Sequence, residues 1–534
     1  MIDHDCTTIL EEDRDHELRV TFNPPLYLQR KIWILDVMRR DSVTDVVDIG
    51  CGEGQLLIAL CQPAPWLGPP PPEILPPSDA TDTAAPNFNS PHDPIPNLHP
   101  TRIAGLDISQ RDLDFAIEAT APPPQTNDRH LTSTRWEPLV ASIWKGGLEV
   151  INEAFVGVEC IVSSEVIEHL PSHIFPFFAP VLLGVYHPKI FLVTTPSYTF
   201  NARFTSPNAP PSVRKGYPDP TGRTNRIFRH DDHKFEWTVQ EFHEWCKETA
   251  ERWGYEAHIS DVGRATEKDE WGRDEALGGA TLVVEFRRLA LADAERSRLV
   301  DEARKMVEST QGQTHQLLVE HRHVAHPQAQ QPISVVEIGT MVKAKMEEER
   351  EGFVRFETLW YDRDIEAACG GFTEVMIRAI EECEGLVLKR EGTDDEELSK
   401  LDRDSWHIEL IGGSRQPKML WPTTEEVEDT SFESLPSDWV PDEEAYSDSS
   451  SDRERGESTG AEGDISWNNS EDDTQDEEDD DHQKWGSEVQ DCWAAEPDAT
   501  RWGNRDWVST TPPHTSGGST TGWDGDESDD THTL

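Results

Sequence analysis

The chain has 534 residues, more than one ordinary domain, and its hydrophobic content of 35% lies below the roughly 45–50% typical of globular proteins. Its formal net charge of −56 at pH 7 excludes nucleic-acid binding through overall charge and leaves a local basic surface as the route to any such contact. Eight scattered cysteines and the lack of any window near about 18 apolar residues argue against a disulfide framework, a zinc ribbon and a membrane span, so we expect a soluble intracellular protein, cytoplasmic or alternatively nuclear.

Hydrophobic periodicity predicts strands that alternate with helices through the first part of the chain. In chain order the predicted elements are a helix over 26–38, a strand over 44–50, a glycine-rich turn and helix over 51–61, a strand over 102–109, a helix over 112–119, a strand over 158–164, a helix over 165–170, a strand over 189–196, a helix over 238–254, strands over 255–263 and 278–288, an amphipathic helix over 292–308 and a strand over 406–412. This alternation predicts an α/β fold with a doubly wound, mostly parallel Rossmann-like sheet and helices on both faces.

Composition divides the chain into three regions. The α/β domain is expected over residues 1–290, with a Pro-rich insertion at 62–100 that is predicted to be disordered or polyproline II. A helix-rich accessory region without an assigned role follows over 291–424. The region 425–534 is predicted to be a disordered acidic tail, since residues 441–534 contain 28 Asp and Glu against 5 Lys and Arg.

The first strand runs into the sequence VVDIGCGEG, a tight strand-to-helix turn that contains Asp48, Gly50 and Gly52. Glycines let a ligand approach the backbone without interference from a Cβ, and Asp107 at the end of the second strand is suited to accept hydrogen bonds from a ribose. The loop lacks a phosphate-binding lysine and is not a dinucleotide G-x-G-x-x-G. We predict S-adenosylmethionine as the cofactor, also contacted by Ser163, and leave open a dinucleotide or a degenerate domain that binds neither.

Three candidate metal ligands follow the strand that ends in VSS, namely Glu165, Glu168 and His169. Spacings of three and four residues place their side chains on one face of a predicted helix, and a mixed oxygen and nitrogen set suits Mg²⁺ or Mn²⁺. A solvated charged helix face is the alternative, and E-x-x-E-H also occurs in methyltransferases of small molecules. His233, in the H-x-x-H run that starts at His230, could supply a fourth ligand or could instead cap a helix or pack against neighbouring aromatics.

A net positive segment precedes His233. Residues 203–234 contain 7 Lys and Arg against 3 Asp, and we predict that Arg203, Arg229 and Lys234 contact the phosphates of an RNA end. The alternative for this stretch is an ordinary exposed loop.

A resemblance to a known family rests on the motifs FNPPLYLQR, VVDIGCGEGQLL, GLDIS, SSEVIEHL, VTTPSYTFN and FRHDDHKFEWT. Together they resemble those of the RNA 3′-terminal 2′-O-methyltransferases that protect small silencing RNAs. The resemblance spans residues 22–287 without the Pro-rich insertion. Its glycine and E-x-x-E-H parts are generic, whereas DHKFEWT, TPSYTFN and PPL-x-x-QR are specific. One departure is Ser197, which stands where the family usually has Asn.

The resemblance implies a class I S-adenosylmethionine-dependent methyltransferase domain. It implies that Glu165, Glu168, His169 and His233 match the metal ligands and that Asp48 and Asp107 contact the cofactor. It implies a metal that binds the 2′ and 3′ hydroxyls of the terminal ribose, with His169 or a nearby base taking the proton. The alternatives are an O-methyltransferase of small molecules and a non-catalytic adaptor that binds an Argonaute protein.

The acidic tail contains tryptophans next to glycine at Trp485, Trp502 and Trp523. An exposed indole without a core to enter is a natural anchor for a partner pocket, and these dipeptides resemble the Trp-Gly hooks that bind Argonaute or Piwi proteins. The alternative is a solubilising tail with incidental tryptophans.

Overall fold

The computed structural model describes residues 17–76, 95–123, 133–307, 313–390 and 406–412. Its largest sheet has eight strands in the order β10-β3-β2-β1-β4-β5-β9-β8. The bounds of these strands are β1 Asp45–Ile49, β2 Arg102–Asp107, β3 Leu139–Lys145, β4 Cys160–Ser164, β5 Ile190–Pro196, β8 Tyr255–Val262, β9 Thr281–Arg288 and β10 Gln316–His323. The five strands from β3 to β5 run parallel, and β8, β9 and β10 are antiparallel to their neighbours. The doubly wound, mostly parallel sheet is therefore confirmed.

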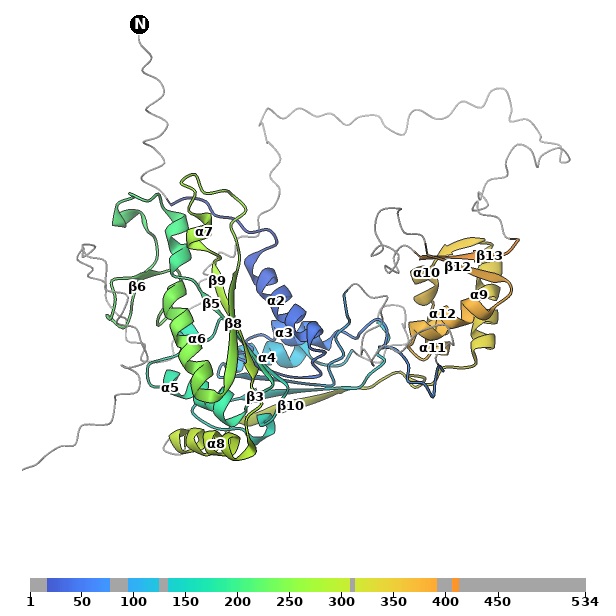
Figure 1. Ribbon diagram of the computed structural model, residues 1–534, viewed down its shortest axis with the longest axis horizontal. Coiled ribbons are helices and arrows are strands. Elements are labelled where there is room, and N and C mark those ends of the chain that lie inside the picture. Colours follow the sequence, from blue (N-terminus) through green and yellow to red (C-terminus); the bar gives the residue numbers. More distant parts are fainter. Residues whose placement is uncertain (1–16, 77–94, 124–132, 308–312, 391–405, 413–534) are drawn as a thin grey trace, which may run out of the picture. The chain divides into compact units, whose positions relative to one another are not determined.

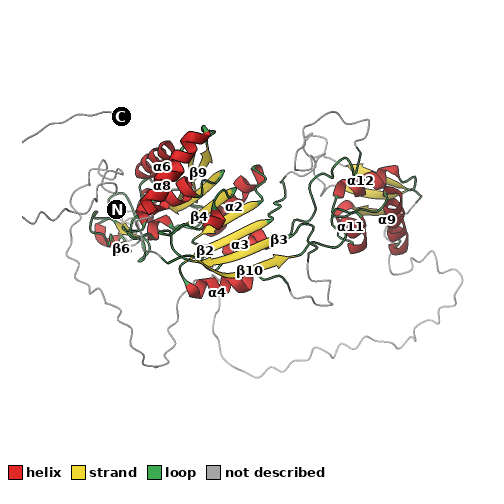
Figure 2. Ribbon diagram, turned by 90° about the horizontal axis from the view of Figure 1, so that it is seen from below, coloured by secondary structure: helices red, strands yellow, loops and turns green. Residues whose placement is uncertain are grey.

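Helices cover both faces of this sheet (Figures 1 and 2). One face packs against α2, α3 and α4, and the other against α5, α6 and α8. Their bounds are α2 Leu26–Arg40, α3 Gln55–Cys61, α4 Gln110–Ala119, α5 Phe175–Ala179, α6 Val239–Trp253 and α8 Asp293–Val307. Local sequence fixes the ends of α6, because Thr238 and Glu241 form a capping box at its start and Gly254 ends it in the left-handed region. Among the described residues no helix is long and apolar enough to cross a bilayer.

The α/β domain extends past the predicted boundary at residue 290. Leu299, Ala303 and Val307 of α8 are buried in the core on one face of the sheet, and β10 pairs with β3 along its whole length. The sequence pattern showed that α8 is amphipathic but not what its apolar face covers. The predicted domain boundary at residue 290 therefore excludes α8, which packs on the sheet, and β10, which is its edge strand.

A second cluster of elements forms the core of the accessory region. Its elements are α9 Val335–Glu349, β11 Phe353–Arg355, α10 Phe356–Trp360, α11 Arg363–Ala368, α12 Thr373–Glu382, β12 Leu386–Arg390 and β13 Trp406–Leu410. The three strands are antiparallel in the order β11-β13-β12. This order is the arrangement of a winged helix: one helix and one strand, then further helices, then a pair of strands of which the last is central in the sheet. The expected strand at 406–412 is confirmed as β13.

Helix α12 occupies the place of a recognition helix in this arrangement. Most of its residues are buried, and those that are not include Glu374, Glu381 and Glu382 beside a single Arg378. Arg378 lies 3.5 Å from Glu382, so its charge is already matched. Helix α12 therefore offers no basic face to a nucleic acid.

The Pro-rich insertion was predicted to be disordered or polyproline II, but part of it packs into a folded core. Its residues 62–76 are described, and Leu67 is 4% exposed within the core of the winged-helix cluster. The amide of Leu67 donates to the carbonyl of Gly371 at 2.8 Å, and the Trp360 indole donates to the carbonyl of Pro65 at 3.3 Å. The prediction rested on the proline content and gave too little weight to the apolar residues by which this stretch packs. Residues 77–94 and the acidic tail, with Trp485, Trp502 and Trp523, lie outside the described residues.

A charge placed on the buried side of α8 tests its role in the core. Ala303 is fully buried, and we expect Ala303→Asp to lower the free energy of unfolding by about 3–5 kcal/mol, because it buries an unpaired carboxylate. Ala294, exposed on the same helix, is the matched control, and Ala294→Asp is expected to change stability by less than about 0.5 kcal/mol. Urea denaturation measures both, and equal midpoints for the two variants would contradict the packing.

Candidate functional site

The glycine-rich turn lies at the carboxyl end of β1, where the strand order of the sheet reverses between β1 and β4. Gly50, Gly52 and Gly54 have φ angles of 71°, 50° and 81°, in the left-handed region that favours glycine. A Cβ on Gly52 would meet no described atom within 4 Å, so the turn presents open backbone there. The carboxylate of Asp107 accepts hydrogen bonds from the amides of Gly52 at 2.9 Å and Ser109 at 2.8 Å.

The predicted cofactor residues Asp48, Gly50, Gly52 and Asp107 thus gather at the ends of β1 and β2. Burial raises the pKa of Asp48 to about 8, and the charge of Asp107 adds to this rise. Ser163 lies next in line, on β4 beside β1, and its fully buried hydroxyl has no hydrogen-bond partner among the described residues. Open backbone, a ribose-type carboxylate and an unpartnered hydroxyl together fit a nucleoside cofactor.

The turn touches the segment that carries the predicted metal ligands. A Cβ on Gly50 would lie 2.4 Å from Cγ2 of Val166, so only glycine allows this approach. Val166 stands between Glu165 and Glu168, which brings the candidate ligand segment directly against the cofactor turn.

The segment at 165–170 is not the helix that the sequence predicted. Glu165 has a φ of 56°, and only a single 3₁₀ turn follows, over Ile167–His169. The amide of Glu165 donates to the Thr194 hydroxyl at 3.1 Å and to the Thr194 carbonyl at 3.0 Å, which ties the turn to β5. Convergence of the side chains therefore comes from a tight turn and not from the 3.6-residue period of a helix.

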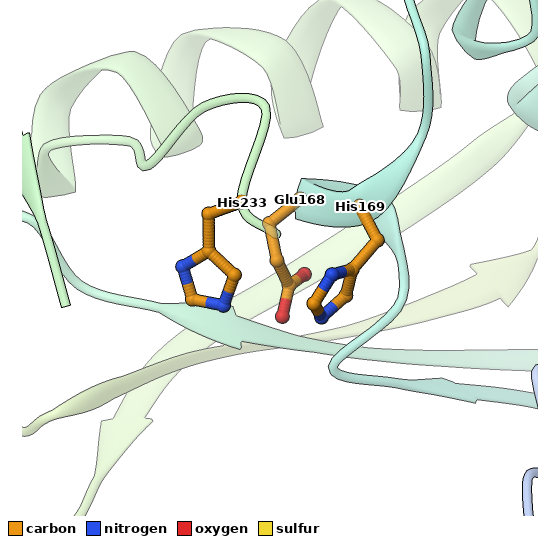
Figure 3. A group of neighbouring side chains, drawn as sticks. All are labelled: Glu168, His169 and His233. Carbon is orange, nitrogen blue, oxygen red and sulfur yellow. The ribbon is translucent and has the colours of Figure 1, made fainter. Parts of the chain in front are cut away.

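Three of the four predicted ligands converge (Figure 3). Glu168, His169 and His233 each offer an atom such that all three atoms lie within 4.8 Å of one another. Glu168 is fully buried; its Oε2 accepts from the Thr195 hydroxyl at 3.0 Å, while its Oε1 has no partner among the described residues. Burial, and then the nearby charge of Glu165, raise the pKa of Glu168 well above its usual value. A carboxylate oxygen in this position needs a cation or a proton.

Two acidic residues orient the imidazoles. Glu236 is 1% exposed and lies 2.8 Å from Nδ1 of His233, and Asp232 lies 3.2 Å from Nδ1 of His169. In each ring this leaves Nε2 for a cation, in the carboxylate–histidine arrangement common around protein metals. The Lys234 amide donates to the Glu168 carbonyl at 2.7 Å and joins the two ligand segments.

Glu165 is engaged elsewhere. Its carboxylate lies 3.2 Å from the guanidinium of Arg30 and accepts from the Thr194 hydroxyl at 2.8 Å. The structure thus places the fourth predicted ligand beside the group but outside it. One carboxylate oxygen and two imidazole nitrogens form a donor set that fits Mn²⁺, with water or a substrate to complete the coordination.

The residues predicted to contact RNA, Arg203, Arg229 and Lys234, differ in their exposure to solvent. Arg203 is 4% exposed, donates to the Glu267 carbonyl at 2.7 Å and lies 3.7 Å from Asp269, so its assignment to an RNA surface is wrong. Arg229 is about one third exposed, pairs with Glu17 at 2.5 Å and lies over the Phe204 ring.

Lys234 keeps a partly exposed side chain 2.9 Å from Asp232. Arg226, counted in the same segment, is buried in a bidentate pair with Glu241. The basic surface is therefore smaller than the composition predicted, because a count of charges does not show which of them are paired inside the fold.

Sequence reasoning missed several residues that shape the site. Arg30 lies in the PPL-x-x-QR motif, but nothing in its spacing showed that it reaches Glu165. Asp232 and Glu236 flank His233 in the sequence, and an acid at either side of a candidate ligand histidine was the available signal. Thr194 and Thr195 lacked any such signal, because side-chain pairing between β4 and β5 is not visible before the strands are placed.

The sheet order, with antiparallel β9 between β5 and β8, and the glycine turn at the end of β1 define a class I methyltransferase fold. The chain is similar to proteins named small RNA 2′-O-methyltransferase, with 27% identity over 272 residues for that of Arabidopsis thaliana, 26% over 246 for Gallus gallus and 26% over 234 for Schizosaccharomyces pombe. These matches cover 50%, 46% and 44% of this chain. They confirm the resemblance that the motifs predicted. No family model matches the chain.

The matches span 23% of the Arabidopsis thaliana protein and about half of the other two. Among solved structures, the small RNA methyltransferase HEN1 aligns at 24% identity and a TM-score of 0.37, over 57% of this chain and 29% of that one. A TM-score this low adds nothing to the topology, which rests on the strand order and register given above.

A methyl group on the cofactor turn tests the cofactor site. Gly52 and Gly157 both have positive φ, and a Cβ on either would meet no described atom within 4 Å. We expect Gly52→Ala and Gly157→Ala to lose a similar, modest stability of about 1–2 kcal/mol. Only Gly52→Ala is expected to weaken S-adenosylmethionine binding, by about tenfold, because the added methyl keeps the ligand from the backbone. Calorimetric titration measures this, and equal affinities of the two variants would contradict the assignment.

The buried carboxylate behind His233 gives a test of the metal group. Glu236→Gln keeps the shape but removes the charge that orients the imidazole, and we expect it to lower Mn²⁺ affinity by roughly 10–100-fold. Glu244→Gln, an exposed position on α6, is the control and should leave affinity unchanged. Electron paramagnetic resonance of free Mn²⁺ measures both, and wild-type affinity in Glu236→Gln would argue against ligation by His233.

Proposed function

We propose that this protein transfers a methyl group from S-adenosylmethionine to the 2′-hydroxyl of the 3′-terminal nucleotide of small RNA, in a reaction that depends on Mg²⁺ or Mn²⁺. The observation that carries the proposal is the group of Glu168, His169 and His233, set against the glycine turn through Val166. Similarity to small RNA 2′-O-methyltransferases supports the choice of acceptor. We further propose that the product is a small silencing RNA with a protected end, as the sequence motifs led us to expect, and that the protein acts in the cytoplasm or the nucleus, as its cysteine content led us to expect.

Each part of the site has a task in this reaction. S-adenosylmethionine, when bound, supplies an electrophilic methyl group. Asp107 is placed to hold its ribose, and the open backbone at Gly52 admits it without a steric barrier. A divalent cation, when bound, supplies a Lewis acid for the two hydroxyls of the terminal ribose. Glu168, His169 and His233 would hold that cation, and their attachment to the turn fixes acceptor against donor.

The proton of the 2′-hydroxyl is assigned to His169 or to a nearby base. Burial, and then the proximity of His233, lower the pKa of His169, which favours the neutral ring that can accept a proton. Asp232 beside its Nδ1 would stabilise the charged ring. Ligation and proton transfer would both use Nε2, so His169 can take the proton only if it does not hold the cation in that step; if it does hold the cation, the proton goes to another base nearby.

Two other functions remain as alternatives. An O-methyltransferase of small molecules would use the same turn and ligands but would not prefer RNA in an acceptor screen. A non-catalytic adaptor would fail to bind S-adenosylmethionine, and the open turn at Gly52 speaks against it.

Binding of an Argonaute or Piwi protein through the tail stays a separate proposal. Recovery of that partner by the tail, compared with its triple Trp→Ala version at Trp485, Trp502 and Trp523, tests it, and equal recovery would end it.

The chemistry of the RNA end tests the proposed function. Because both ribose hydroxyls are needed to reach the cation, an RNA that ends in 2′-deoxy, 3′-deoxy or 3′-phosphate is expected to be a poor acceptor. Methyl transfer with and without Mn²⁺, followed by periodate oxidation of the product, measures activity and position together. Methylation of a 3′-phosphate end as efficient as that of a diol end would contradict the two-hydroxyl arrangement.

A further inference from the structure

His230 is a third histidine beside the metal group that the proposed function leaves without a task. Its ring stacks on that of His233, with centroids 5.1 Å apart and planes at 27°, and lies edge-on to that of His169 at 5.8 Å. It is not one of the three residues whose ligand atoms converge. His230 therefore extends the group without joining it.

The exposed fraction of the side chain increases from one histidine of this cluster to the next. Their side chains are 9% exposed at His233, 31% at His169 and 59% at His230. The backbone amide of Asp232 donates to Nδ1 of His230 at 3.2 Å, which holds the ring in place although most of it faces solvent. One face of the His230 ring rests on His233, and the exposed remainder is available to a ligand.

We propose that His230 stacks against the base of the terminal nucleotide while its ribose lies at the Glu168, His169 and His233 group. The inference rests on the proposed function and specifies how that site holds its acceptor. A ribose bound through its hydroxyls carries its base only a few bonds away, within reach of a ring that lies 5.1 Å from one ligand imidazole and 5.8 Å from the other.

Stacking on an aromatic side chain, histidine included, is a common way to hold single-stranded RNA and tolerates every base, because each has a π-face. The same contact explains how an RNA end could be held where the basic surface is small. His230 is thus a substrate-binding residue without a part in the methyl transfer.

The experiment compares two RNAs that differ only in the terminal base. One short single-stranded RNA ends in adenosine, and the other ends in an abasic ribose that keeps both hydroxyls. With the full-length protein we expect KM to be roughly 5- to 150-fold higher for the abasic end, the range that corresponds to one stacked base. His230→Ala should raise KM for the adenosine end to the abasic value and leave KM for the abasic end unchanged. His230→Phe should keep most of the difference.

Mn²⁺ affinity is the second readout and should be unchanged in both variants. His243→Ala, an exposed histidine on α6, is the control and should behave as wild type. A His230→Ala protein whose KM is unchanged, or rises equally for both ends, would overturn the stacking role. Rescue by His230→Gln but not by His230→Phe would overturn it too, in favour of a hydrogen bond. Failure of the unaltered protein to methylate either RNA would instead contradict the proposed function, and the stacking role with it.

Discussion

A buried carboxylate, Glu168, and a half-buried one, Glu165, lie close together after β4, and the rest of the site follows from how their charge is balanced. Glu165 is matched by Arg30 and by the Thr194 hydroxyl. Glu168 has a single hydroxyl contact and one oxygen without a partner among the described residues. Removing a carboxylate from water costs several kcal/mol unless it is paired, and the imidazoles of His169 and His233 nearby are donors suited to a cation. The fold thus balances the charge of Glu165 from within and leaves one oxygen of Glu168 without a partner among the described residues, which is why we propose a metal there.

Main-chain geometry, more than side-chain pattern, makes this arrangement possible. Gly50 leaves room for Val166, so the cofactor turn and the ligand turn are in direct contact. The left-handed backbone at Glu165 turns the chain sharply, and the hydrogen bond from Lys234 to Glu168 brings in the segment with His233. The cofactor turn and the candidate ligand segments are therefore joined by direct contacts at the carboxyl edge of the sheet, where doubly wound folds bind their ligands.

Strand and helix periods were sufficient to predict the parallel sheet and to locate Asp48 and Asp107, because both features are local in sequence. Pairing between distant segments was not predictable in the same way. Arg203 looked like an RNA contact until its acidic partners were placed around it, and β10 could not be assigned to the sheet without knowing its neighbour. The winged-helix arrangement of α9 to β13 could not be predicted from the sequence, because its strands are short and its core includes Leu67 from the distant Pro-rich insertion.

The most direct test of the central claim is anomalous diffraction from crystals grown with Mn²⁺. The account predicts a manganese peak at bonding distance from Oε1 of Glu168 and from Nε2 of His169 and His233, with Glu165 still paired to Arg30 or shifted toward the ion. Absence of a peak there under saturating Mn²⁺, with Glu168 bonded instead to a protein or water donor, would contradict it.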